Sequence, residues 1–255
     1  MTLAKQTPDS IRAFKGSGRK LAALTAYDFP MARMLDEAGV PLMLVGDSLG
    51  MVVLGYPDTT HVVMEEMEHH VRAVARARPK ALIVADLPYR SYDTRAAAES
   101  NARRLVAAGA AAVKAEGGVE ILEQVRAIIG AGVPFLGHLG MLPQHVIEEG
   151  GYRIKGRDAA QRAAILEGAR ALESAGAFGI VLELVASAVA AEVTATIGIP
   201  TIGIGSGADC DGQILVTPDI IGMFPWFTPR FVRRRSDGAG MIQDAVRGWM
   251  AEIGA

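Results

Sequence analysis

Three acidic residues stand where short apolar runs of the sequence end. They are Asp47 after residues 42–46, Asp86 after residues 81–85 and Glu116 just after residues 110–115. An apolar run of strand length that is followed by a turn signal is typical of a buried parallel strand, and α/β proteins keep their chemistry at the C-terminal ends of such strands. Three carboxylates that converge there need a cation, so the pattern predicts a metal site.

Lys114 lies two residues before Glu116, so on a strand both side chains project to the same side. A buried charge without a partner loses several kcal/mol of hydration, so these two residues must either pair or bind something. The alternative to a binding site is a structural ion pair between them. Asp47 and Asp86 have a structural alternative too, since Asp often caps the segment that follows it.

Glu183 stands alone inside the apolar residues 179–185. Burial raises the pKa of a carboxyl group, which makes Glu183 a better proton acceptor near neutral pH than an exposed glutamate. A buried salt bridge, for example with Lys114, is the alternative. His138 ends the apolar residues 134–138 and is a candidate for contact with a substrate or with the metal site, although a histidine there can also be purely structural.

Apolar runs alternate with segments of helical period along the whole chain, as repeated βα units do. The expected strands cover residues 21–25, 42–46, 81–85, 110–115, 134–138, 178–184, 200–204 and 213–216. Several helices end in a similar phrase with glycine, at Gly39, Gly109, Gly132 and Gly176, which predicts a recurring turn. Eight units in 255 residues favour a (β/α)8 barrel. The competing doubly wound sheet lacks its Gly-rich turn after residues 21–25.

Composition narrows the class of protein further. The chain has 255 residues, a formal net charge of −2 and 50% hydrophobic residues, which is enough for a large core and argues against nucleic-acid binding. No apolar run approaches the roughly 18–20 residues of a membrane span. The N-terminal residues lack the apolar core of a signal peptide, so we expect a cytoplasmic protein. No linker divides residues 1–255, which predicts one domain with a helical tail near residues 240–252.

Seven motifs, in order, give the chain a resemblance to a known family. They are LTAYD (24–28), VGDSLG (45–50), ADLP (85–88), VKAEGG (113–118), GHLG (137–140), GGY (150–152) and DGQILV (211–216). Together they resemble the ketopantoate hydroxymethyltransferases. The resemblance implies a (β/α)8 barrel of the phosphoenolpyruvate/pyruvate superfamily. It also implies transfer of the one-carbon unit of 5,10-methylenetetrahydrofolate to 3-methyl-2-oxobutanoate, which gives 2-dehydropantoate and tetrahydrofolate in pantothenate synthesis.

The same resemblance assigns roles to individual residues. Asp47 and Asp86 would bind Mg²⁺, with Glu116 as a direct or water-bridged ligand. Ser48 and Lys114 would hold the oxo acid together with Asp47 and Asp86, and Glu183 would accept the proton. The family assembles as a decamer of two pentameric rings, which implies a homo-oligomer here.

Two alternatives stay open at this point. A Mg²⁺-dependent carbon–carbon lyase of the same superfamily, of the isocitrate lyase or phosphonopyruvate type, would share Asp47 and Asp86. Those lyases carry a catalytic cysteine in the loop after the fourth strand, where this chain has residues 116–118, EGG. A catalytically inert barrel with a binding role is the other alternative, and the presence of every proposed ligand and of the base argues against it.

Overall fold

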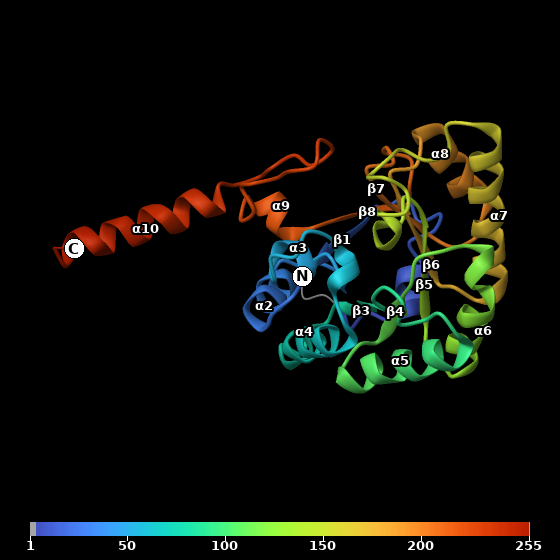
Figure 1. Ribbon diagram of the computed structural model, residues 1–255, viewed down its shortest axis with the longest axis horizontal. Helices are drawn as coiled ribbons and strands as arrows, with labels where there is room; N and C mark the ends of the chain where they lie inside the picture. The colour runs from blue at the N-terminus through green and yellow to red at the C-terminus, as the bar shows by residue number, and fades with distance from the viewer. Residues whose placement is uncertain (1–3, 255) are drawn as a thin grey trace. The chain divides into compact units, whose positions relative to one another are not determined.

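The computed structural model describes residues 4–254, and in this range eight parallel strands form a closed barrel in the order of the sequence (Figure 1). The amide of Leu21 donates to the carbonyl of Asp211 at 2.9 Å, which ties the first strand to the start of the last. The predicted (β/α)8 barrel is therefore confirmed. The strands are β1 Leu21–Thr25, β2 Leu42–Val45, β3 Leu82–Asp86, β4 Ala112–Lys114, β5 Phe135–Gly140, β6 Gly179–Glu183, β7 Thr201–Ile204 and β8 Gly212–Leu215.

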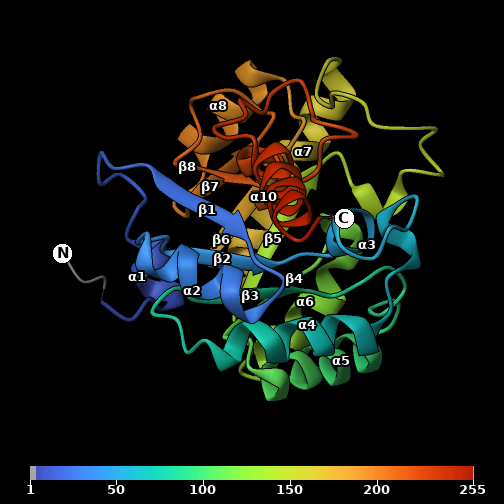
Figure 2. The ribbon, with the colours of Figure 1, turned by 90° about the vertical axis from the view of Figure 1, so that its left-hand side faces the viewer.

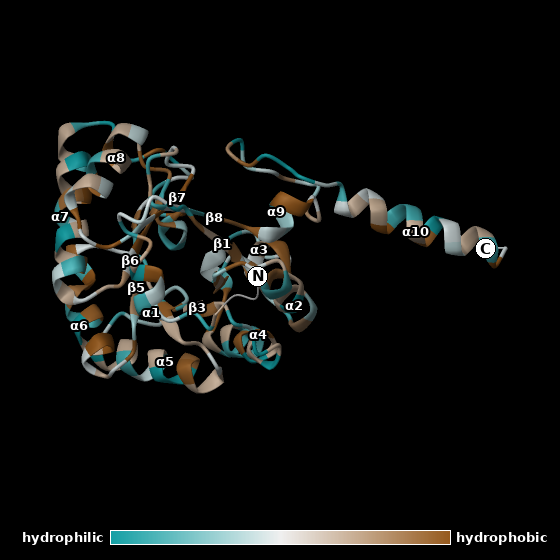
Figure 3. Cartoon of the chain, turned by 180° about the vertical axis from the view of Figure 1, so that it is seen from behind, coloured by the Kyte–Doolittle hydropathy of each residue, from teal (hydrophilic) through white to brown (hydrophobic). Residues whose placement is uncertain are grey.

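Helices and short 3₁₀ turns connect the strands. The helices are α1 Pro8–Arg12, α2 Phe29–Glu37, α3 Leu49–Val52, α4 Met64–Arg76, α5 Arg95–Ala108, α6 Leu122–Gly130, α7 Ala159–Ala175, α8 Ser187–Thr196, α9 Thr217–Ile221 and α10 Gly238–Glu252. The 3₁₀ turns are η1 Thr59–His61, η2 Val119–Ile121 and η3 Pro143–His145. In Figure 3, α4, α5 and α7 carry both teal and brown residues, as helices with one buried face do.

Side chains with oxygen atoms begin several of the helices, and glycines end them. Asp28, Thr94 and Asp158 each accept a hydrogen bond from a backbone amide in the first turn of α2, α5 and α7, which satisfies a donor that the helix leaves open. The four glycines of the recurring phrase all have positive φ, between 79° and 120°. The recurring turn predicted from the sequence is confirmed.

Apolar side chains fill the inside of the barrel. Along β2, Leu42 and Leu44 belong to the cluster inside the barrel, whereas Met43 and Val45 belong to the cluster beneath the helices. This alternation follows from the period of two along a strand. Figure 2 shows β1, β2 and β3 side by side. Since the interior is packed, a substrate can reach polar groups only at an end of the barrel.

Some predicted boundaries need correction. His138 was expected to end its strand, but β5 continues to Gly140, so His138 lies within it. The reason is that Gly140 pairs with Glu183 of β6 in a conformation that favours glycine, with φ at 101°. Between β4 and β5 the chain forms η2 and then α6 rather than one continuous helix. β4 ends at Lys114, which leaves Glu116 in the loop that follows.

The chain divides into two compact units, of which one ends at Ile214 and the other begins at Leu215. The second unit contains α9 and α10, and α10 covers the helical tail expected near residues 240–252. The expectation of a single domain over residues 1–255 stays a prediction. Within residues 4–254, every helix is too short or too polar to cross a membrane.

We expect Gly140→Ala to destabilise the protein by about 2 kcal/mol or more, because a Cβ there would lie 2.2 Å from the carbonyl oxygen of Glu183 and φ is positive. Gly130→Ala is the matched control, since a Cβ at Gly130 meets nothing within 4 Å and alanine favours a helix. Urea unfolding of both variants tests this. Equal stability of Gly140→Ala and the parent would refute the close approach of β5 and β6.

Candidate active site

The inward-facing rows of four strands end in polar side chains. The last apolar residues of these rows, all packed inside the barrel, are Val84, Ala112, Leu136 and Val181. The next inward positions, two residues further along each strand, are Asp86, Lys114, His138 and Glu183. The structure therefore brings four of the predicted site residues together as a polar layer above the apolar interior, at the C-terminal end of the barrel.

Lys114 and Asp86 form a buried ion pair at the centre of this layer. Their charged atoms, Nζ and Oδ1, lie 2.9 Å apart, and the two side chains are 4% and 3% exposed. Asp86 Oδ2 accepts a hydrogen bond from the backbone amide of Asp47 at 3.1 Å. Asp86 thus holds the neighbouring loop rather than capping its own segment, and Lys114 pairs with Asp86 rather than with Glu116.

Crowding of carboxylates changes the pKa values of this cluster. Burial, and then repulsion from Asp86, raises the pKa of Asp47 to about 7. Burial, and then Asp47, raises the pKa of Glu116 well above its ordinary value. Burial alone would lower the pKa of Lys114, but Asp86, Glu116 and Asp47 outweigh it and raise this pKa. Such shifts are typical of sites that bind ions or move protons.

Glu183 and His138 lie next to each other at the edge of the cluster. Their closest nitrogen and oxygen atoms, Nε2 and Oε2, are 3.5 Å apart, and His138 Nδ1 is 3.7 Å from Oε1 of Glu116. Neither ring nitrogen of His138 makes a hydrogen bond. Burial, and then the charge of Lys114, lowers the pKa of His138 well below its ordinary value, so the ring is neutral. A neutral, buried ring with open nitrogens can serve a bound substrate.

Burial raises the pKa of Glu183 to about 8, although Lys114 opposes this shift. Among the described residues, Lys114 has its ion pair with Asp86 and none with Glu183, so the salt bridge considered for Glu183 is not formed. The backbone around Glu183 is fixed by Ser206, whose hydroxyl donates to the carbonyl of Leu182 and accepts from the amide of Val185. Glu183 therefore has the environment of a proton acceptor.

Ser48 lies next to the cluster and does not act as a helix cap. It stands at the N-terminus of α3, but its side chain makes no capping bond. Its Oγ is instead 2.8 Å from the hydroxyl of Tyr27. The hydroxyl of Ser48 is thereby oriented beside Asp47.

The donor atoms suit a hard divalent cation. Asp47, Asp86 and Glu116 offer carboxylate oxygens, the ligand type that Mg²⁺ prefers. Within residues 4–254, no three His, Cys, Asp or Glu side chains are already arranged to hold a metal ion. Carboxylates without a cation repel one another, so we expect small side-chain movements on binding, and the ligand set stays a prediction.

Two residues of the cluster carried no signal in the sequence. Gln144, on η3, is 1% exposed and donates from its side chain to Asp47 Oδ2 at 2.7 Å and from its backbone to Glu116 Oε2 at 3.0 Å. Tyr92, in the loop after β3, is 7% exposed and contacts Gln144. Both lie in loops, where no periodic pattern distinguishes an inward residue from an outward one.

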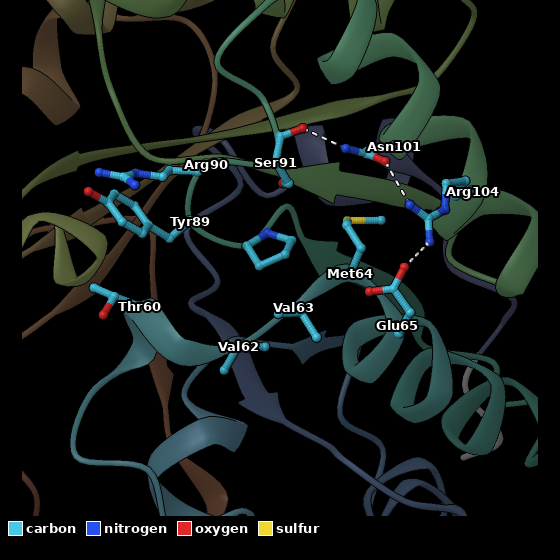
Figure 4. Close-up of a pocket in the computed structure, with 11 residues that line it drawn as sticks. Thr60, Val62, Val63, Met64, Glu65, Tyr89, Arg90, Ser91, Asn101 and Arg104 are labelled. Atoms are coloured by element: carbon cyan, nitrogen blue, oxygen red, sulfur yellow. Dashed lines mark hydrogen bonds and ion pairs between the residues drawn. The ribbon is translucent and has the colours of Figure 1, made fainter.

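Two cavities adjoin the loop after β3. One, of about 430 Å³, lies beside η1 and the start of α4 (Figure 4). Asn101 and Arg104 close its polar side. They are hydrogen-bonded to each other, and Asn101 also bonds to the loop after β3 and Arg104 to α4. This cavity contains none of the predicted site residues. The other cavity, of about 570 Å³, is lined by Glu116, Tyr92 and residues of the loops after β3, β4 and β5. Only this second cavity reaches the carboxylate cluster.

The raised pKa of Glu183 predicts a stability effect in the metal-free protein. Between the unfolded pKa of about 4.5 and the folded pKa of about 8, the folded chain retains a proton that the unfolded chain has lost, so stability falls as pH rises through this window. Glu183→Gln has no carboxyl group at this position, so its stability does not fall with pH for this reason. We expect it to exceed the parent in free energy of unfolding by a few kcal/mol at pH 8.5, and by much less at pH 4.5. Urea unfolding with a chelator measures this, and a difference independent of pH would contradict it.

The arrangement agrees with comparisons to known proteins. The chain matches the family described as ketopantoate hydroxymethyltransferase over residues 5–255. A 3-methyl-2-oxobutanoate hydroxymethyltransferase of Carboxydothermus hydrogenoformans is 49% identical over 249 residues, which cover 97% of this chain and 90% of the relative. An enzyme of the same name from Pyrobaculum calidifontis is 54% identical over 245 residues, which cover 94% and 90%.

Among solved structures, a phosphonopyruvate hydrolase in complex with oxalate and Mg++ has a TM-score of 0.63 at 16% identity, with 83% of this chain and 80% of that chain covered. This second likeness concerns the barrel fold, whereas the matches in sequence extend over nearly the whole chain. The chain therefore belongs to the ketopantoate hydroxymethyltransferase family of enzymes.

Proposed function

We propose that this protein transfers the one-carbon unit of 5,10-methylenetetrahydrofolate to 3-methyl-2-oxobutanoate, giving 2-dehydropantoate and tetrahydrofolate in pantothenate biosynthesis. The observation that carries the proposal is Glu183, whose side chain is only 15% exposed and whose pKa is raised to about 8, beside a cluster of three carboxylates and one ammonium. Such a cluster suits a 2-oxo acid, and the adjacent carboxylate suits removal of its C3 proton.

Asp47, Asp86 and Glu116 would hold Mg²⁺, the cation named for the phosphonopyruvate hydrolase of the same fold. When bound, the cation polarises the keto group of the oxo acid and offsets the charge of its carboxylate. Ser48 and Lys114 would bind the oxo acid. When all three carboxyl groups are ionised, they and the ammonium carry a net charge of two minus, which a divalent cation would neutralise.

Glu183 would take the proton from C3 of the oxo acid. The electron pair that remains forms the new carbon–carbon bond to the methylene carbon of the folate, and water supplies the hydroxyl oxygen of the product. Both carbon–nitrogen bonds of that methylene group break. The two folate nitrogens take up the proton held by Glu183 and one proton of the water, which gives tetrahydrofolate. His138, neutral and 3.5 Å from Glu183, would contact the substrate on this side. We place the folate in the cavity of about 570 Å³ that Glu116 and Tyr92 line, because it is the described cavity that reaches the cluster.

A lyase of the isocitrate lyase or phosphonopyruvate type remains the second candidate, since a phosphonopyruvate hydrolase shares the barrel. Identity of about one half over nearly the full chain favours the transferase. An inert binding barrel is disfavoured because a buried acid such as Glu183 costs stability without helping a purely structural role.

We also infer a homo-oligomer, a decamer by family resemblance, that acts in the cytoplasm on small molecules rather than on nucleic acid or membranes. Large apolar side chains of α10, including Met241 and Trp249, are more than half exposed in the single chain. Exposed apolar groups of this kind are typical of surfaces that another subunit covers.

Proton exchange tests the base. In D₂O with Mg²⁺ and 3-methyl-2-oxobutanoate, we expect metal-dependent loss of the C3 proton signal by NMR. Glu183→Gln should slow this exchange by about 10²–10⁴-fold, because its amide cannot accept the proton. Glu167→Gln, on the exposed face of α7, is the matched control and should exchange at the parent rate. Absence of exchange in the parent, with or without folate, would disprove the mechanism.

Asp86→Asn tests the ligand assignment. The amide keeps the shape of the side chain and an acceptor for the amide of Asp47 but is a poor ligand for Mg²⁺. We expect turnover with methylenetetrahydrofolate to fall about 100-fold or more, while circular dichroism shows a folded barrel. Unchanged turnover would remove Asp86 from the ligand set.

A further inference from the structure

Gln144 connects four successive loops of the barrel. It lies on η3 in the loop after β5, and its hydrogen bonds reach the loops after β2, β3 and β4. Its side-chain amide donates to Asp47 Oδ2 at 2.7 Å and to the carbonyl of Leu87 at 2.9 Å, and its backbone amide donates to Glu116 Oε2 at 3.0 Å. Its Oε1 lies 2.6 Å from the hydroxyl of Tyr92.

The chemistry of the neighbours fixes the orientation of the amide. The carbonyl of Leu87 can only accept, so the NH₂ group of Gln144 must face it, and the same group then donates to Asp47 Oδ2. Oε1 then faces Tyr92, whose single hydroxyl proton is donated to it rather than to the more distant carbonyl of Glu116, 3.2 Å away. Both donors and the acceptor of the Gln144 side chain are therefore in use.

This arrangement restrains two carboxylates at once. Gln144 holds one oxygen of Asp47 and one oxygen of Glu116, and a monodentate ligand needs only the other oxygen of each. The bond to Asp47 comes from the side-chain amide and the bond to Glu116 from the backbone amide. The side-chain amide adds no charge, whereas a lysine or arginine at this position would compete with a cation for Asp47. Asp86 is held differently, by Lys114 and by the backbone of Asp47.

We propose that Gln144 is a positioning residue for the divalent cation: its hydrogen bonds to Asp47 and Glu116, anchored through Leu87 and Tyr92, set these two carboxylates for metal binding. The inference rests on the proposed function in that Asp47 and Glu116 are taken as ligands. Gln144 itself contacts neither the cation nor the substrate in this role. Partners that orient the ligands of a metal typically change its affinity about 10–100-fold.

The test is Mn²⁺ binding by the metal-free protein without substrate, measured by titration calorimetry. Mn²⁺ is the probe because it shares the oxygen preference of Mg²⁺. Gln144→Met keeps the length of the side chain but has no side-chain donors, so it loses the bonds to Asp47 and Leu87 and retains the backbone bond to Glu116. We expect the Kd to rise about 10–100-fold. Tyr92→Phe removes only the partner of Oε1 and should raise the Kd by a smaller factor.

His145→Ala is the matched control on the same turn. The imidazole of His145 is 38% exposed and bonds to Glu148, away from the cluster, so its loss should leave the Kd unchanged. Asp86→Asn is the reference for a lost ligand. Urea unfolding of each variant, compared with the parent, shows whether a change in Kd occurs in a folded protein. If Gln144→Met does not fold, the increase in Kd of Tyr92→Phe decides.

The outcomes separate the two proposals. A parent that binds no Mn²⁺ overturns the proposed metal site and this inference with it. In a second outcome, the parent binds Mn²⁺, Asp86→Asn binds it more weakly, and Gln144→Met binds it as the parent does. This result overturns only the role of Gln144. Where Gln144→Met does not fold, parental binding in Tyr92→Phe has the same meaning. Weaker binding in the folded Gln144 or Tyr92 variant, with His145→Ala unchanged, supports it.

Discussion

The buried ion pair between Lys114 and Asp86 is the interaction on which the rest of the site depends. Two charges removed from water are stable only when they meet closely and their remaining atoms find partners. Asp47 and Glu116, in the loops after β2 and β4, also interact with the ammonium of Lys114, and together with Asp86 they raise its pKa. Removal of one member of such a pair typically costs about 3–5 kcal/mol, so the pair constrains the barrel as well as the chemistry.

Hydrogen-bond donors stabilise the carboxylates that the single ammonium of Lys114 cannot neutralise. The backbone amides of Asp47 and Gln144, and the side-chain amide of Gln144, all point at carboxylate oxygens. Their dipoles lower the energy of the negative charges without neutralising them. A deficit of positive charge therefore remains in a site closed from below by apolar side chains. This is the condition under which a divalent cation binds most strongly.

Much of this could be predicted from sequence, and the reason is the regular period of the strands. Apolar runs such as residues 42–46 predicted the barrel. The acids that follow such runs, Asp47, Asp86 and Glu116, were predicted to lie close together. Boundaries were less certain, because β5 continues to Gly140 through a contact with β6 that no local pattern encodes. Gln144 was missed for a similar reason: its bond to Asp47 joins residues 97 positions apart, and a loop has no repeat from which its inward direction could be read.

The positions of the polar residues around the barrel have a consequence for how the site can change. The three carboxylates of the proposed metal site lie at the ends of β2, β3 and β4: Asp47 follows β2, Asp86 is the last residue of β3 and Glu116 follows β4. Glu183 stands on β6. The residues at the ends of β2, β3 and β4 would therefore bind the substrate, and the residue on β6 would react with it. The loop after β5 lies between these two parts of the barrel. Substitutions near Glu183 can therefore change the reaction, while the residues of β2, β3 and β4 still bind the same kind of small acid.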